Sequence, residues 1–165
     1  MFNNTKGFSL METLIYVAIL SLIIGGLFSF SLTIAANRNK AYAAQEVQAN
    51  IRGLVTAINA DMRTADDVIS PTAGNSQATL VLDMGANPDI TYSITNGIVY
   101  RTLGVGDPVA ISTTGVLIES VVFKNLATAN DRDNIELTAT INYAGSASQD
   151  FRYSQNLQTA FSLKK

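Results

Sequence analysis

The hydrophobic and polar positions divide the chain into three successive patterns. From Thr13 to Asn37, 25 residues contain no Asp, Glu, Lys or Arg, which is long enough for a helix to span a bilayer. One acidic residue, Glu12, stands at the start of this run. A carboxylate at the membrane-entering end of a helix is costly unless something neutralises it, so Glu12 is a candidate functional residue that needs a partner.

The second pattern, from Arg38 to about Asp67, has the period of an amphipathic helix. Apolar residues recur there at spacings of three and four, at Val47, Ile51, Leu54, Ile58, Met62 and Ala65. Because this rhythm continues from the apolar run, we predict one long helix from Ser9 to Asp67. Pro71 closes the helical region, since the residue before a proline is biased away from helix.

Beyond Pro71 the pattern becomes that of β-strands. Branched and aromatic residues gather in five segments, Thr79–Asp83, Ile90–Thr95, Ile98–Leu103, Val116–Phe123 and Ile135–Tyr143. Asn96-Gly97 predicts a hairpin with a type I′ turn, and a last strand is expected over Thr159–Leu163. We therefore predict an α+β fold, in which an antiparallel sheet within residues 78–163 covers the apolar face of the helix.

Composition narrows the chemistry that this domain can perform. The chain has no Cys and no His, which excludes disulfides, thiol nucleophiles and zinc–thiolate sites and removes the commonest general base. We expect no cofactor and no enzymatic activity. The clustered pair Lys164-Lys165 is interpreted as a solvated tail, so there is no strong signal for nucleic-acid binding.

The N-terminal motif is the most specific signal in the sequence. Lys6-Gly7-Phe8 is followed by Glu12, four residues after the phenylalanine, and then by the long apolar helix. This combination resembles the class III signal of type IV pilins and pseudopilins. The resemblance implies that a membrane prepilin peptidase cuts between Gly7 and Phe8 and methylates the new N-terminal Phe8. It also implies that Glu12 pairs with the N-terminal ammonium of a neighbouring subunit during filament assembly.

Under this interpretation, residues 1–7 are a leader, 8–37 a transmembrane and filament-core helix, and 38–165 a soluble domain with helix 38–67. Loss of Lys6 leaves one basic residue fewer than the 11 of the full chain, against 13 acidic residues, for a net charge of −3. An ordinary secretory signal, ending near Ile34-Ala35-Ala36, and a plain single-pass anchor are alternatives. Neither gives a reason for Glu12.

Two glycines, Gly25 and Gly26, interrupt the apolar run with poor helix formers, each costing about 1 kcal/mol relative to alanine. Close packing of helices in a membrane would use small residues here. Local melting, which happens in some filament pilins on assembly, would use them as well. The sequence leaves both interpretations open.

The soluble domain carries a second, more scattered resemblance. Asp61-Met62-Arg63-Thr64-Ala65, Tyr92, Val99-Tyr100-Arg101 and Val122-Phe123 are similar to positions of J-type minor pseudopilins and PilW-like minor pilins. The chain is short for the J type and lacks the C-terminal cysteine pair of many major pilins. Glu12 argues against the K-type tip pseudopilin, which lacks this acid.

Two groups of acidic residues are candidate sites. Asp61, Asp66 and Asp67 lie near the predicted helix end and are interpreted as a solvated helix end rather than a catalytic group. The segment Asn130–Asn134 contains Asp131 and Asp133, whose oxygens suit calcium, although Asn and Asp are also the usual residues of tight turns. A turn is the favoured interpretation, and Asp131 and Asp133 are weak metal candidates.

These observations predict a minor pilin or pseudopilin of a type IV pilus or a type II secretion-type filament. The partners that this implies are prepilin peptidase, other pilins, an inner-membrane assembly platform, and membrane lipid before assembly. The resemblance places the leader in the cytoplasm and the C-terminal domain outside it. A major pilin, or a membrane-tethered module that binds a ligand, DNA or an exported protein, is the alternative, and the machine served (secretion, twitching or competence) is left open.

Overall fold

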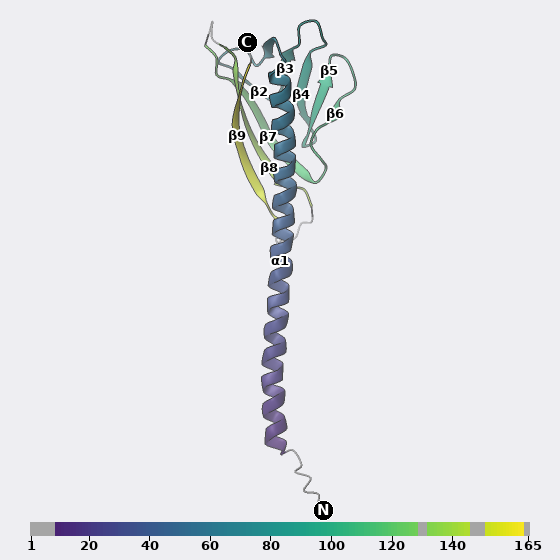
Figure 1. The fold of residues 1–165 in the computed structure, drawn as a ribbon, viewed down its shortest axis with the longest axis vertical. Helices are drawn as coiled ribbons and strands as arrows, with labels where there is room; N and C mark the ends of the chain where they lie inside the picture. The colour runs from purple at the N-terminus through teal and green to yellow at the C-terminus, as the bar shows by residue number, and fades with distance from the viewer. Residues whose placement is uncertain (1–8, 129–131, 146–150, 164–165) are drawn as a thin grey trace, which may run out of the picture. The chain divides into compact units, whose positions relative to one another are not determined.

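The computed structural model describes residues 9–128, 132–145 and 151–163. Within these ranges there is one α-helix, α1 (Leu10–Met62) (Figure 1). The chain divides into two compact units, Met1–Asn39 and Lys40–Lys165, and α1 contributes to both. In the described part of the first unit only the N-terminal part of α1 is present. The second unit contains the rest of α1 and all the described strands.

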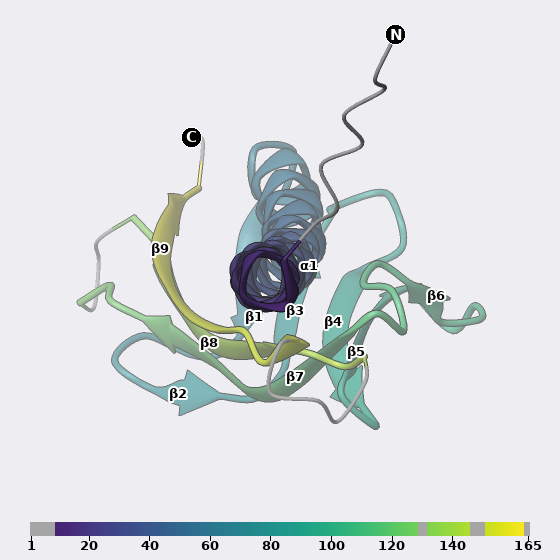
Figure 2. The same ribbon diagram turned by 90° about the horizontal axis from the view of Figure 1, so that it is seen from below.

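The described strands form two antiparallel sheets. The first sheet, in the order β1-β3-β4-β5-β6, consists of β1 (Asp67–Ser70), β3 (Leu80–Asp83), β4 (Ile90–Thr95), β5 (Ile98–Leu103) and β6 (Val109–Ala110). The second sheet, in the order β2-β7-β8-β9, consists of β2 (Ser76–Gln77), β7 (Val116–Asn125), β8 (Asn134–Tyr143) and β9 (Ser154–Ser162). Figure 2 shows these strands from below, with β9 and β4 on opposite sides of the part of α1 that belongs to the second unit.

The predicted α+β architecture is confirmed, but the single sheet of the prediction is wrong. After β6, the chain does not run on into a neighbouring strand of the same sheet. Its next segment is held by hydrogen bonds to α1, where the Thr113 N–H donates to the Asn50 side-chain oxygen at 2.8 Å. The chain therefore leaves the first sheet and starts the second at Val116.

The predicted end of the helix near Asp67 is also wrong, because α1 ends at Met62. Beyond it, the N–H groups of Thr64 and Ala65 both donate to the Asp61 carbonyl, at 3.0 and 2.9 Å. The Thr64 hydroxyl donates to the same carbonyl at 3.0 Å. Asp67 then pairs with Asp83, in β1 and β3. Ala65 continues the apolar spacing of the helix by one position beyond Met62, but strand pairing overrides this pattern.

The other predicted strands agree with the structure in place and mostly in length. β4 and β5 have the predicted bounds, and Asn96 (φ 52°) and Gly97 (φ 76°) both have the positive φ that a type I′ turn requires. The last strand is longer than predicted, since β9 begins at Ser154 rather than Thr159. Its inward positions before Phe161 are Gln155, Leu157 and Thr159, and a strand with so few apolar residues gives little signal in the sequence.

The hydrophobic core lies within the second unit. One stripe of α1 is buried there, at Ala43, Val47, Asn50, Ile51, Leu54, Ile58 and Met62. Alternate residues of both sheets pack against this stripe, and the largest of them with no more than 2% exposure include Tyr92, Phe123, Leu80, Leu82, Ile135, Leu137 and Ile141. Each sheet therefore buries one face, and the helix completes the core of both.

Candidate functional site

The N-terminal part of α1 presents apolar side chains without covering them. Every described residue from Ser9 to Ala35 is exposed. Among the described residues, α1 is the helix long and apolar enough to cross a membrane by length and composition. An apolar surface of this extent marks contact with a membrane or with another protein.

Glu12 lies in the first turn of α1, and the structure shows that Ser9 caps this turn, which the sequence analysis did not predict. The Glu12 N–H donates to the Ser9 carbonyl at 3.0 Å and lies 3.3 Å from the Ser9 hydroxyl oxygen. Ser9 is thus the N-cap of α1, and Ser9-x-x-Glu12 has the spacing of a capping box. The carboxylate also lies where the helix dipole favours negative charge. Among residues 9–128, 132–145 and 151–163, no cation forms an ion pair with it.

The helix continues through Gly25 and Gly26 without a break. A Cβ added at either position would meet nothing within 4 Å. Within the part of the chain that the structure describes, nothing therefore requires glycine at these two positions. Close packing in a membrane and melting on assembly both stay hypotheses.

The remaining predicted site residues divide between described and undescribed positions. Gly7, Phe8 and Asp131 lie outside the described residues. Asp133 is half-buried, and its Oδ1 accepts a hydrogen bond from the buried Asn125 side-chain nitrogen at 2.8 Å. Within the ranges that the structure describes, no group of three or more acidic side chains could hold a metal ion.

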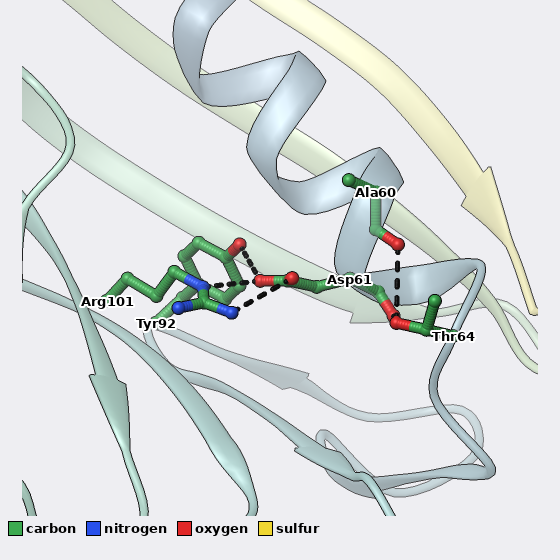
Figure 3. Close-up of polar contacts among 5 residues, drawn as sticks. All are labelled: Ala60, Asp61, Thr64, Tyr92 and Arg101. Carbon is green, nitrogen blue, oxygen red and sulfur yellow. Dashed lines mark hydrogen bonds and ion pairs between the residues drawn. The ribbon is translucent and has the colours of Figure 1, made fainter.

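A polar cluster at the end of α1 joins the helix to the first sheet (Figure 3). Arg101 Nε donates to Asp61 Oδ2 at 2.6 Å, and Arg101 Nη2 donates to Asp61 Oδ1 at 3.0 Å. The Tyr92 hydroxyl donates to Asp61 Oδ2 as well. Tyr92 and Arg101 face each other in the register of β4 and β5, so both reach the same carboxylate. We name these three residues the Asp61 clamp.

Burial decides the electrostatics of the Asp61 clamp. Tyr92 is fully buried, whereas the side chains of Asp61 and Arg101 are 15% and 27% exposed. Burial, reinforced by the hydrogen bond to Asp61 and by its negative charge, raises the pKa of Tyr92 well above its ordinary range. The hydrogen bond to Asp61 likewise raises the pKa of Arg101. The clamp therefore holds a neutral phenol and a charged guanidinium on one carboxylate.

This geometry corrects the prediction that Asp61 belongs to a solvated helix end. Asp66 and Asp67 are indeed exposed, but Asp61 faces the sheet and is satisfied on both oxygens. A two-pronged arginine–carboxylate pair is a strong positional contact. The clamp fixes the first sheet against the last turn of α1.

A second polar cluster, the Asn50 clamp, joins α1 to the segment before β7. Asn50 is 7% exposed, and its side-chain nitrogen donates to the Glu46 carbonyl at 2.9 Å and to the Thr113 hydroxyl at 3.1 Å. The Thr113 hydroxyl in turn donates to Glu46 Oε1 at 3.0 Å. A signal for this cluster exists in the sequence, because Asn50 is a polar residue within the apolar stripe. The partner, 63 residues away, could not be read from the sequence.

Comparison with known proteins identifies the N-terminal segment. The family model of the prokaryotic N-terminal methylation motif matches residues 2–28. This match supports a type IV pilin-like protein, and the pilin-type motif belongs to a structural rather than an enzymatic family. Together with the apolar part of α1, it fits a single-pass membrane-anchored protein. No curated protein and no solved structure gives a match.

Proposed function

We propose that this protein is a minor pilin or pseudopilin. It is matured by cleavage between Gly7 and Phe8 and by methylation of Phe8. It waits in the inner membrane with its C-terminal domain outside the cytoplasm, and it then joins a short filament. The observation that carries the proposal is the match of the methylation motif to residues 2–28, which include most of the apolar, fully exposed part of α1.

The physical basis of assembly is the transfer of the apolar helix from lipid to a bundle of similar helices. Its exposed residues include Leu14, Ile19, Ile23, Leu27 and Phe30. Lipid and a helical bundle both keep such side chains out of water. The hydrophobic contribution to the free energy is therefore nearly the same before and after the transfer. Contacts that differ between the two states must therefore select the docked position.

Glu12 is the residue proposed to make this selection. Since no described cation pairs with it in the single chain, its carboxylate is available to the N-terminal ammonium of a neighbouring subunit. Two charges that lose their water offset one another only when they meet. A misplaced subunit would leave both charges unpaired, so the ion pair stabilises one register of the subunit in the filament.

The test is incorporation of Glu12→Gln and Glu12→Ala into sheared filaments from the native host. Both variants are expected to insert and to be cleaved, because the apolar run and Gly7-Phe8 are unchanged. Both should be strongly depleted from filaments. Glu119→Gln, which removes an exposed carboxylate from β7, is the matched control and should incorporate normally.

Mass spectrometry of the mature chain separates processing from docking. An N-terminal methylated Phe8 is expected in a host with prepilin peptidase, and an intact Met1 there would refute the cleavage. Incorporation of Glu12→Gln at the wild-type level would refute the pairing. Glu12 would then be an acidic residue in the first turn of α1, where the helix dipole favours negative charge.

The assignment as a minor subunit of the J or PilW type is part of the same proposal. It rests on scattered positions of the second unit, of which Asp61, Tyr92 and Arg101 come together in the Asp61 clamp. Their convergence supports a common structural reason for these residue types. Quantification of the subunit relative to the main subunit in purified filaments tests the assignment, and equal or greater abundance would contradict it.

A further inference from the structure

An aromatic and basic patch lies on the second unit, on residues that the proposed assembly does not use. Tyr143 stacks on Phe151 with ring centroids 6.0 Å apart and an angle of 18° between the ring planes. Tyr42, on α1, meets the same Tyr143 ring edge-on at a centroid distance of 6.2 Å. Arg152 and Tyr153 follow Phe151 directly. We name these five residues the Tyr143 patch.

The patch is open to its surroundings rather than sealed into the core. Tyr42 is 56% exposed, Arg152 is exposed, and Tyr143, Phe151 and Tyr153 are half-buried. Beside them lies a hollow of about 420 Å³ lined by Asn142, Tyr143, Arg152, Tyr153 and Ser154. Among the described residues of this lining, Arg152 is the one that carries a charge. A partner that fits here must accept aromatic rings and carry negative charge.

The position of Tyr42 in the chain identifies such a partner. Tyr42 follows Asn37, the end of the uncharged run, by five residues, and both residues belong to α1. Five helical residues rise only about 8 Å. The headgroup layer on one side of a bilayer is roughly 5–8 Å thick. Tyr42 therefore lies at the level of the lipid headgroups when the run spans the membrane.

We propose that the Tyr143 patch is a docking surface for an anionic bilayer, on which the domain rests before assembly. Tyrosine is enriched at the membrane–water interface, because its ring is apolar and its hydroxyl is polar. Arg152 complements anionic headgroups. Arg38 and Lys40, four and two residues before Tyr42 on α1, add positive charge near the end of the uncharged run. Tyr42, on α1, is the residue of the patch nearest in sequence to the uncharged run.

This inference rests on the membrane anchoring that the proposed function includes. It also goes beyond that function, because it assigns a role to the domain while the subunit waits in lipid. A docked domain would be held close to the bilayer by its own aromatic residues. Release from the membrane would then be a step that precedes or accompanies incorporation.

The chain contains no tryptophan, so a single introduced tryptophan reports its own environment. Full-length Phe151→Trp is reconstituted into vesicles of phosphatidylcholine with phosphatidylglycerol, with and without lipids brominated in their acyl chains. We expect brominated lipid to lower the tryptophan emission and anionic lipid to shift the emission to the blue. Val105→Trp, on a fully exposed residue, is the matched control and should keep its emission.

Charge dependence provides the second measurement. Arg152→Gln in the Phe151→Trp background should lower the ratio of docked to undocked domains about fivefold, since each basic residue near an anionic surface contributes about that factor. Vesicles of phosphatidylcholine alone should give a similar loss of quenching. Circular dichroism of Arg152→Gln should be unchanged, because this exposed side chain lies on the surface.

The outcomes separate this inference from the proposed function. Phe28→Trp, within the apolar run, reports insertion of the anchor, and its quenching without quenching of Phe151→Trp would overturn the inference. Equal quenching of Val105→Trp would overturn it too, because the domain would then approach the bilayer without a preferred face. No quenching of Phe28→Trp would refute the anchoring itself. Normal incorporation of Glu12→Gln would refute the pairing of Glu12 with the N-terminal ammonium of a neighbouring subunit, and it would leave the inference about the Tyr143 patch unaffected.

Discussion

Replacement of Asp61 by alanine tests whether the Asp61 clamp holds the first sheet to α1. The variant removes the acceptor of two hydrogen bonds from Arg101 and of one from Tyr92, which is fully buried. Breaking a fully buried ion pair costs about 3–5 kcal/mol. The Arg101 side chain is 27% exposed and can regain some water, so we expect a loss of about 2–4 kcal/mol in the free energy of unfolding.

The assay is thermal and urea unfolding of residues 38–165, whose hydrophobic core includes no residue of the anchor. For a domain of this size, about 1 kcal/mol corresponds to roughly 3 °C in Tm, so Asp61→Ala should lower Tm by about 6–12 °C. Asp107→Ala, at an exposed aspartate in the loop after β5, is the matched control and should stay within about 0.5 kcal/mol.

A double-mutant cycle with Arg101→Met isolates the contact itself. The two single variants should lose more stability in sum than the double variant loses, because each leaves the other partner without its contact. We expect a coupling energy of about 1–2 kcal/mol. A loss for Asp61→Ala no greater than that of Asp107→Ala, together with additive effects in the cycle, would refute the assignment of the clamp.

Three further predictions concern other features of the domain. The pKa of Tyr92 is raised in the folded state above its unfolded value of about 10. The stabilisation that results is fully present below pH ~10, and the free energy of unfolding falls as pH rises further, by up to about 1.4 kcal/mol per pH unit. Tyr92→Phe should lack this loss in urea titrations at alkaline pH. Asn125→Ala should cost about 2–4 kcal/mol, since the buried amide donates to the Pro71 carbonyl and to Asp133, and Asn125→Asp should cost more because it sets two carboxylates against each other. Gly97→Ala should cost about 1–2 kcal/mol because its φ is +76°, whereas Gly53→Ala, in an open position of α1, should add about 0.5–1 kcal/mol.

Each of these predictions has a clear contrary result. Equal alkaline destabilisation of wild type and Tyr92→Phe would show that the phenol of Tyr92 ionises as readily in the folded domain as in the unfolded chain. Equal effects of the two Asn125 variants would show that Asp133 is not a close acceptor. A destabilising Gly53→Ala would show that this glycine has a packing role that the single chain does not explain.

Local pattern predicted those parts of the fold in which a residue's neighbours in sequence decide its state. Asn96-Gly97 specified its turn by conformational preference alone, and the alternation along Ile135–Tyr143 matched the buried face of β8. The predicted apolar stripe agrees with the buried face of α1 up to Met62 for the same reason. In each case the period of the sequence is the period of the element.

Pairing between distant segments explains what the sequence could not predict. The segment from Asp67 to Ser70 is a strand because Leu80–Asp83 lies beside it, and nothing in its own residues requires this. β2 and β6 have two residues each and exist only through their partners. Asp61 resembled a solvated residue because its partner Arg101 lies 40 positions further along the chain.

The two clamps have a mechanical consequence for a subunit that is pulled by its anchor. α1 is the only described element that belongs to both units, so a load applied to the anchor enters the domain through this one helix. The Asn50 clamp holds the helix in the N-terminal half of its buried stripe, and the Asp61 clamp holds it at the C-terminal end. Sliding α1 out along its axis would shear both clamps and the apolar stripe between them together, rather than one contact at a time. We therefore expect the two clamps together to resist traction on the anchor better than either clamp alone.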